Sequence, residues 1–109
     1  MELYENQISF NLAPVVDVNI FNEKILKGRS YSHDPMVVTQ IASFFIDSCY
    51  SNKVIPCLKH FPGHGAANGD THLNIIKSDL SLGELTSTHI KPFVNLIDKV
   101  ELIMLSHIN

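Results

Sequence analysis

The alternation of strand-like and helical segments is the feature that most constrains the fold of this chain. Three short apolar segments predict buried strands: Ile8–Val18, Val54–His60 and Glu101–His107. Between the first two, Asp34 and Pro35 are typical of a helix start, and apolar residues at helical spacing predict a helix from about Pro35 to Tyr50. The mixed, polar segment Asn19–Ser32 predicts a long loop before that helix.

A second helical region separates the last two predicted strands. Ser81–Glu84 has the spacing of a capping box, and an apolar stripe follows it. Because Pro92 falls inside this stretch, we expect either a kink or two short helices that meet there. Alternating strands and helices are typical of parallel βαβ units, so the predicted fold class is α/β. Periodicity alone leaves open whether the sheet belongs to an eight-stranded barrel or to an open doubly wound sheet.

Composition excludes several classes of partner. The chain has 109 residues, 45% hydrophobic and 17% charged, with a net charge of -3 and a single arginine, Arg29. No basic stripe is present, so we expect no nucleic-acid partner. No apolar run reaches the roughly 18 residues that cross a bilayer, and the start does not resemble a signal peptide, which favours a cytoplasmic location and no membrane. Cys49 and Cys57 lie in apolar settings and are expected to be free thiols.

Polar side chains gather at the carboxyl ends of the predicted strands and on the loops that follow. Asp17, Lys59, His60, Ser106 and His107 lie at strand ends, and Arg29, His64, Asp70 and His72 lie on the following loops. In parallel α/β architectures, ligands bind at this edge of the sheet. A single strand-end histidine or lysine is more often incidental, but nine such residues on one edge favour a ligand site.

The densest polar cluster is Lys59–Gly65, with the sequence Lys-His-Phe-Pro-Gly-His-Gly. Lysine supplies a charged donor, and the two histidines supply donors of adjustable protonation, which suits a polyhydroxylated ligand. The glycines let the backbone approach closely. The alternative is a tight turn in which the histidines are incidental.

A second pattern, Asp70-Thr71-His72, lies on the long loop predicted for Phe61–Ser78. A carboxylate hydrogen-bonded to a histidine fixes its tautomer and supports its protonated form, which makes the histidine a general acid/base near neutral pH. Taken alone, this short pattern is common and has low specificity.

The histidines could instead bind zinc, with His60, His64 and His72 near Cys57 as ligands. Pro62 and Gly63 disfavour the helix that would present the first two on one face, so we expect no metal and no cofactor. Two acidic residues with the spacing of a glycosidase pair are not visible in this chain.

Five segments together resemble a known family: Asn11–Val18, Gly28–Pro35, Lys59–Gly65, Asp70–His72 and Met104–His107. Their order and spacing resemble the amino-terminal barrel domain of glycoside hydrolase family 3. The Lys-His-Phe-Pro-Gly-His-Gly and Asp-Thr-His segments are similar to its β-N-acetylhexosaminidase branch. The resemblance implies a partial (β/α)8 TIM barrel of about three parallel strands, and a retaining enzyme that hydrolyses terminal β-linked N-acetylhexosamine from peptidoglycan-derived or chitin-type glycans.

The resemblance also implies roles for single residues. Arg29, Lys59 and His60 would hydrogen-bond the sugar. Asp17, His64 and His107, on the same edge, complete the expected substrate-binding set. His72, oriented by Asp70, would be the general acid/base of a double displacement in which an aspartate is the nucleophile.

The family's nucleophile would lie beyond Asn109, and an earlier sugar-binding strand would precede Met1. We therefore expect residues 1–109 to be an inactive fragment of a single such domain, well under half of a roughly 250-residue barrel. The sequence departs from the family at Asn19–Lys27, which lacks prolines, and at His89, where an acidic residue is common. The competing hypothesis is a truncated, non-catalytic remnant that binds sugar or a partner through an exposed apolar face.

Overall fold

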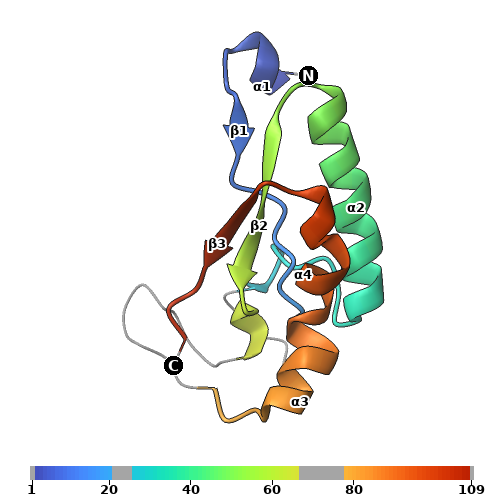
Figure 1. The fold of residues 1–109 in the computed structure, drawn as a ribbon, viewed down its shortest axis with the longest axis vertical. Coiled ribbons are helices and arrows are strands. Elements are labelled where there is room, and N and C mark those ends of the chain that lie inside the picture. Colours follow the sequence, from blue (N-terminus) through green and yellow to red (C-terminus); the bar gives the residue numbers. More distant parts are fainter. Residues whose placement is uncertain (1, 21–25, 67–77, 109) are drawn as a thin grey trace.

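The computed structural model describes residues 2–20, 26–66 and 78–108, and it contains a parallel sheet with helices packed on one side (Figure 1). The strands are β1 (Phe10–Asn11), β2 (Ile55–Phe61) and β3 (Leu102–Leu105), and their order in the sheet is β1-β2-β3. Both pairings are parallel. The prediction of an α/β fold with three parallel strands and intervening helices is confirmed.

The first predicted strand is much shorter than the sequence suggested. Only Phe10–Asn11 pairs regularly with β2, although the chain continues beside β2 and Val15 forms an isolated bridge with Lys59. Pro14 has no N–H to donate to a ladder, which limits regular pairing at this point. The segment is held instead by separate hydrogen bonds, in which the amide of Cys57 donates to Ala13 and the amide of Val16 donates to Lys59.

The predicted helix at Pro35 is present as α2 (Pro35–Ser51). The Asp34 side chain accepts a hydrogen bond of 2.8 Å from the amide of Met36 and caps the helix, while Pro35 occupies its first turn. Its buried face consists of Val38, Ala42, Ile46 and Cys49. The local signals at the start of this helix were therefore sufficient to place it. A short helix at the start of the chain, α1 (Glu2–Glu5), was not predicted.

The second helical region breaks near Pro92, as predicted. It begins with α3 (Leu82–Glu84), where Ser81 and Glu84 form the expected capping box. A π-helical turn, Leu85–His89, follows, and α4 (Lys91–Leu96) then begins with Pro92 in its first turn. A 3-10 turn, Ile97–Lys99, leads into β3.

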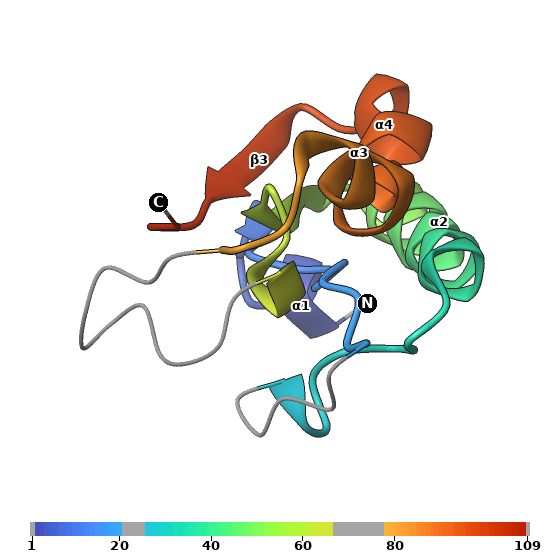
Figure 2. The same ribbon diagram turned by 90° about the horizontal axis from the view of Figure 1, so that it is seen from below.

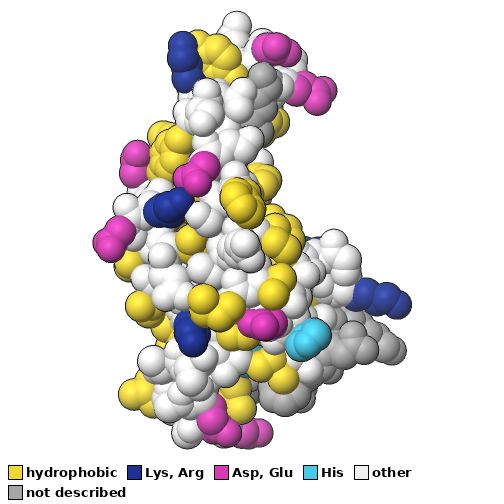
Figure 3. Space-filling model, turned by 90° about the vertical axis from the view of Figure 1, so that its right-hand side faces the viewer, with side chains coloured by type: hydrophobic (Ala, Val, Ile, Leu, Met, Phe, Trp, Pro, Cys, Tyr) yellow, Lys and Arg dark blue, Asp and Glu magenta, His cyan; other side chains and the backbone are white. Residues whose placement is uncertain are grey.

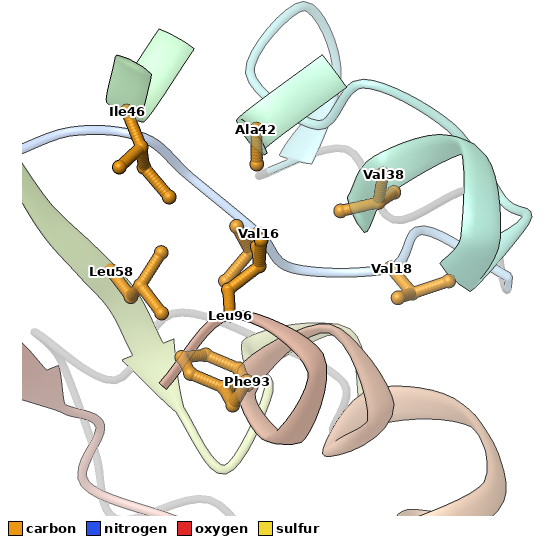
Figure 4. Close-up of a cluster of buried hydrophobic side chains, with 8 residues drawn as sticks. All are labelled: Val16, Val18, Val38, Ala42, Ile46, Leu58, Phe93 and Leu96. Carbon is orange, nitrogen blue, oxygen red and sulfur yellow. The ribbon is translucent and has the colours of Figure 1, made fainter. Parts of the chain in front are cut away.

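The hydrophobic core lies between the helices and the sheet (Figure 4). Its buried side chains come from α2, from the segment after β1, from β2 and from α4; they are Val16, Val18, Val38, Ala42, Ile46, Leu58, Phe93 and Leu96. Burying one large aliphatic or aromatic side chain contributes about 1.5–3 kcal/mol to stability. The core therefore holds α2 and α4 against β2, with the Phe93 ring 5.3 Å from that of Phe61. Figure 2 shows both helices on the same side of the strands.

Within the described residues, no helix has the length and apolar character that a membrane span requires. Hydrophobic side chains are nevertheless spread over the outer face of the helical layer (Figure 3). Phe44 on α2 is 68% exposed, and the outer strands carry Phe10 at 53% and Leu105 at 70%. These apolar side chains leave part of the surface suited to further packing.

Candidate functional site

Asp17 is the centre of a cluster of polar groups at the carboxyl end of the sheet. Its side chain is fully buried. Oδ1 accepts hydrogen bonds from the amides of His60, at 3.1 Å, and His64, at 2.7 Å, while Oδ2 lies 2.7 Å from Nδ1 of His60. A buried carboxylate needs such partners, because desolvation strongly disfavours its charge. Asp17 therefore joins the segment after β1 to the end of β2.

His60 is oriented by this carboxylate. Because Oδ2 of Asp17 is an acceptor, Nδ1 of His60 carries the proton and donates it. In the neutral ring, Nε2 is then a hydrogen-bond acceptor, and the side chain as a whole is 18% exposed. The pair thus presents an imidazole of defined tautomer at the surface of the site.

Lys59 precedes His60 on β2, and backbone hydrogen bonds fix its position. Its amide donates to Pro14 at 3.2 Å, and its carbonyl accepts from Val16 at 2.8 Å. The ladder between β2 and β3 shifts register between Lys59 and Phe61. The peptide bond between Lys59 and His60 is cis. The side chain of Lys59 is partly exposed, at the same end of the sheet as His60.

His64 begins a 3-10 turn, His64–Ala66, and its side chain is buried. Its ring centroid lies 6.0 Å from that of His60, and its Nδ1 lies 3.5 Å from the Ser106 hydroxyl oxygen. The amide of Ser106 also donates to the Phe61 carbonyl at 2.7 Å. His64 thus lies between the ends of β2 and β3 and is more buried than His60.

Two glycines allow this turn to pack closely. Gly63 has a φ of +129°, which L-residues rarely adopt, and a Cβ there would lie 2.7 Å from Cβ of His89. A Cβ on Gly65 would overlap the carbonyl oxygen of Val18. Contacts within the protein therefore favour glycine at both positions.

Arg29 lies on a loop that is anchored beside Asp17. The amides of Arg29 and Ser30 both donate to the Leu26 carbonyl at 3.0 Å. The Ser30 hydroxyl donates to the backbone carbonyl of Asp17 at 2.7 Å. Arg29 itself is exposed, so its guanidinium is accessible to a ligand near this end of the sheet.

Of the remaining predicted site residues, only His107 lies within the described part of the chain. His107 is exposed and follows β3 at the same end of the sheet. Asp70 and His72, the predicted acid/base pair, lie outside the described residues. Among residues 2–20, 26–66 and 78–108, no group of three or more histidine, cysteine or acidic side chains is arranged to hold a metal ion. Cys49 and Cys57 are free and buried, and burial raises the pKa of both thiols.

His89 is a buried residue of this region that sequence reasoning did not include in the site. It is 1% exposed and ends the π-helical turn Leu85–His89. Burial lowers its pKa, and the negative charge of Asp17 opposes that shift in part. Its four-residue spacing from both Leu85 and Phe93, on the predicted apolar stripe, was the signal for its burial.

Comparison with known proteins gives consistent matches along the chain. The family model described as "Glycosyl hydrolase family 3 N terminal domain" matches residues 1–109. A beta-hexosaminidase of Tolumonas auensis is 37% identical over 109 residues, covering 98% of this chain and 32% of the relative. One of Idiomarina loihiensis is 34% identical over 101 residues, covering 93% of this chain and 30% of the relative. The chain therefore spans about a third of the length of these curated relatives.

A solved structure has the same fold over this region. NagZ from Neisseria gonorrhoeae, in complex with N-trifluoroacetyl-D-glucosamine, superposes with a TM-score of 0.91 at 30% identity. The match covers 98% of this chain and 32% of that structure. The arrangement of three parallel strands and their helices is therefore the one found in the corresponding part of that structure.

Proposed function

Because this chain belongs to glycosyl hydrolase family 3, we propose that the complete protein is a glycosidase that releases terminal β-linked N-acetylhexosamine. The observation that carries the proposal is the Asp17–His60 pair, which presents an oriented imidazole at the sheet end where α/β proteins bind ligands. The names of the beta-hexosaminidase relatives support the sugar class. Peptidoglycan-derived or chitin-type glycans are the natural sources that we propose.

The described side chains suit the recognition of a sugar. A sugar hydroxyl can both donate and accept, so it can donate to Nε2 of His60 while it accepts from the ammonium of Lys59. The exposed Arg29 adds a planar donor that can reach a hydroxyl or an amide carbonyl. Backbone contacts hold the main chain of Lys59 and of the Arg29 loop, so both side chains start from fixed positions beside the site.

For the chemical step, we propose His72 as general acid/base and Asp70 as its orienting carboxylate. His72 would protonate the glycosidic oxygen while an aspartate from outside residues 1–109 attacks the anomeric carbon, which gives a glycosyl-enzyme and a free alcohol. Neutral His72 would then take a proton from the attacking water, which releases the sugar and the aspartate. This route retains the anomeric configuration. No cofactor takes part in this scheme.

We further propose that residues 1–109 are one part of a single (β/α)8 barrel domain. Support comes from the chain's share of its relatives' length and from the exposed Phe10 and Leu105 on the two outer strands. The remainder of the barrel would cover these side chains. The same exposed surface is what favours the second candidate, a non-catalytic remnant that binds a partner.

The test uses the complete protein and two N-acetyl-β-glucosaminides, one with a nitrophenyl and one with an alkyl leaving group. We expect release of N-acetylglucosamine from both. His72→Ala should slow the alkyl glycoside about 100-fold or more and the nitrophenyl glycoside much less, because only the poor leaving group needs a proton. Absence of turnover in the unaltered protein would overturn the activity, and equal losses on both substrates would overturn the acid role of His72.

A further inference from the structure

His89 contacts the most constrained turn of the site. The turn begins with the Gly63 amide, which donates to the His60 carbonyl at 2.8 Å, and continues with the Ala66 amide, which donates to Gly63 at 3.0 Å. His89 lies directly against it: a Cβ on Gly63 would be 2.7 Å from Cβ of His89 and 3.2 Å from its carbonyl oxygen. The turn therefore packs against the Cβ and backbone carbonyl of His89, a residue that is only 1% exposed.

Asp17 connects the Gly63–Ala66 turn to His60. The amide of His64, immediately after Gly63, donates to Oδ1 of Asp17, and the amide of His60 donates to the same atom. The other carboxylate oxygen holds Nδ1 of His60. A displacement of the turn would therefore change the hydrogen bonds that orient the His60 ring.

The state of His89 fits a packing role. Burial favours the neutral imidazole and lowers its pKa, and the negative charge of Asp17 opposes this shift in part. The neutral imidazole is buried and adds no second buried charge near Asp17. This requirement differs from those of Lys59 and Arg29, which are charged donors on the ligand side.

We propose that His89 is a positioning residue that holds the Gly63–Ala66 turn and, through Asp17, keeps His60 in its sugar-binding orientation. The inference rests on the proposed function for the identity of the ligand. Its structural part, the coupling of His89 to His60, does not depend on any substrate.

The first experiment is a double-mutant cycle in the complete protein, with N-acetyl-D-glucosamine as the probe and its inhibition constant as the readout. We expect His89→Leu to raise this constant about tenfold, or about 1.4 kcal/mol. In a His60→Ala background the same change should raise it less than about twofold, because coupled residues are not additive. His33→Leu, at an exposed histidine, is the control and should have no effect in either background. Equal effects of His89→Leu in both backgrounds would show a merely structural role and overturn the proposal.

The second experiment follows the Nδ1–H proton of His60 by NMR after selective histidine labelling, with no sugar present. His89→Leu should shift this signal and speed its exchange with water, and Gly63→Ala should do the same from the opposite side of the contact. His89→Gln, which keeps a neutral polar side chain, should restore most of the original signal. If His89→Leu unfolds the protein, the Gly63→Ala and His89→Gln spectra decide the question.

The two experiments separate the possible failures. If the unaltered protein does not bind N-acetyl-D-glucosamine, the proposed function is wrong. The NMR signals of His60 then test the coupling between His89 and His60 by themselves. If the sugar binds but the His60 signal is the same in His89→Leu, Gly63→Ala and the unaltered protein, then the positioning role of His89 is wrong and the proposed function stands.

Discussion

Asp17 shows how one residue can organise a site that no short motif specifies. Its partner His60 is 43 positions away, and the two meet only because the segment after β1 runs beside β2. The sequence predicted that both lie at strand ends. It could not predict that Asp17 is fully buried and holds the backbone as well as the ring, because both depend on strand register.

Replacing Asp17 with asparagine tests this role. The amide oxygen of Asp17→Asn can still accept from the two backbone amides, but its NH2 group would face Nδ1 of His60. That nitrogen would have to accept, so the ring proton would move to Nε2. We expect the affinity for N-acetylglucosamine to fall about tenfold and the free energy of unfolding to fall by about 1–3 kcal/mol. Asp98→Asn, at an exposed position, is the matched control. Equal urea midpoints and affinities for the two variants would contradict the role of Asp17.

His89 gives a prediction for the pH dependence of stability. Its pKa is lowered from 6.5 in the folded protein, so the unfolded chain binds more protons between 6.5 and the lowered value. The free energy of unfolding therefore falls as pH falls through this window. In His89→Gln the free energy of unfolding should change less steeply with pH, by up to about 1.4 kcal/mol per pH unit. Urea denaturation at a series of pH values below 6.5 measures this dependence. The control His33→Gln should leave the pH dependence of the free energy of unfolding unchanged. If His89→Gln also left it unchanged, the pKa of His89 would not differ between the folded and unfolded protein.

Among the elements, those with local signals were predicted well and those defined by pairing were not. Helix α2 was placed to within one residue, because Asp34, Pro35 and the apolar spacing all lie inside or next to it. Strand β1 was predicted as Ile8–Val18 but pairs regularly only at Phe10–Asn11, since a strand's extent depends on its neighbour. The break near Pro92 was predicted because proline constrains its own backbone.

The 3-10 turn His64–Ala66 depends on close packing that a single methyl group would disturb. Gly65→Ala would place a Cβ against the carbonyl oxygen of Val18, which belongs to a fixed backbone segment. We expect the free energy of unfolding to fall by about 1–3 kcal/mol, as for other overpacked sites. Gly83→Ala is the control, because its Cβ would meet only the Ser81 hydroxyl, at 3.9 Å, within a helix. That variant should be neutral or more stable by up to about 1 kcal/mol. Similar thermal midpoints for both variants would mean that the turn adjusts freely.

On the scale of the whole molecule, the described residues form a sheet with α2 and α4 on one side (Figure 2). The outer strands of this sheet carry exposed apolar side chains. The alternation of segments predicted the α/β class correctly. It could not distinguish a closed barrel from an open sheet, because three strands and two crossovers are compatible with both. The likeness to NagZ from Neisseria gonorrhoeae shows that the strands and helices are arranged as in the corresponding part of that structure. That they belong to a closed barrel stays our proposal.

The outer strands predict how the 109-residue chain behaves when it is produced alone. Phe10 on β1 and Leu105 on β3 are more than half exposed, and outer strands offer backbone groups that can pair with another chain. We expect this chain to self-associate and to bind a hydrophobic dye, and the complete protein to do neither. Sedimentation velocity over a range of concentrations measures the association.

The double variant Phe10→Thr and Leu105→Thr should weaken this self-association about tenfold, because threonine keeps the strand propensity and removes apolar area. The control Val94→Thr, on the exposed face of α4, should leave the self-association unchanged. A chain that stays monomeric with little dye binding would show that these strands do not need the rest of a barrel to cover them.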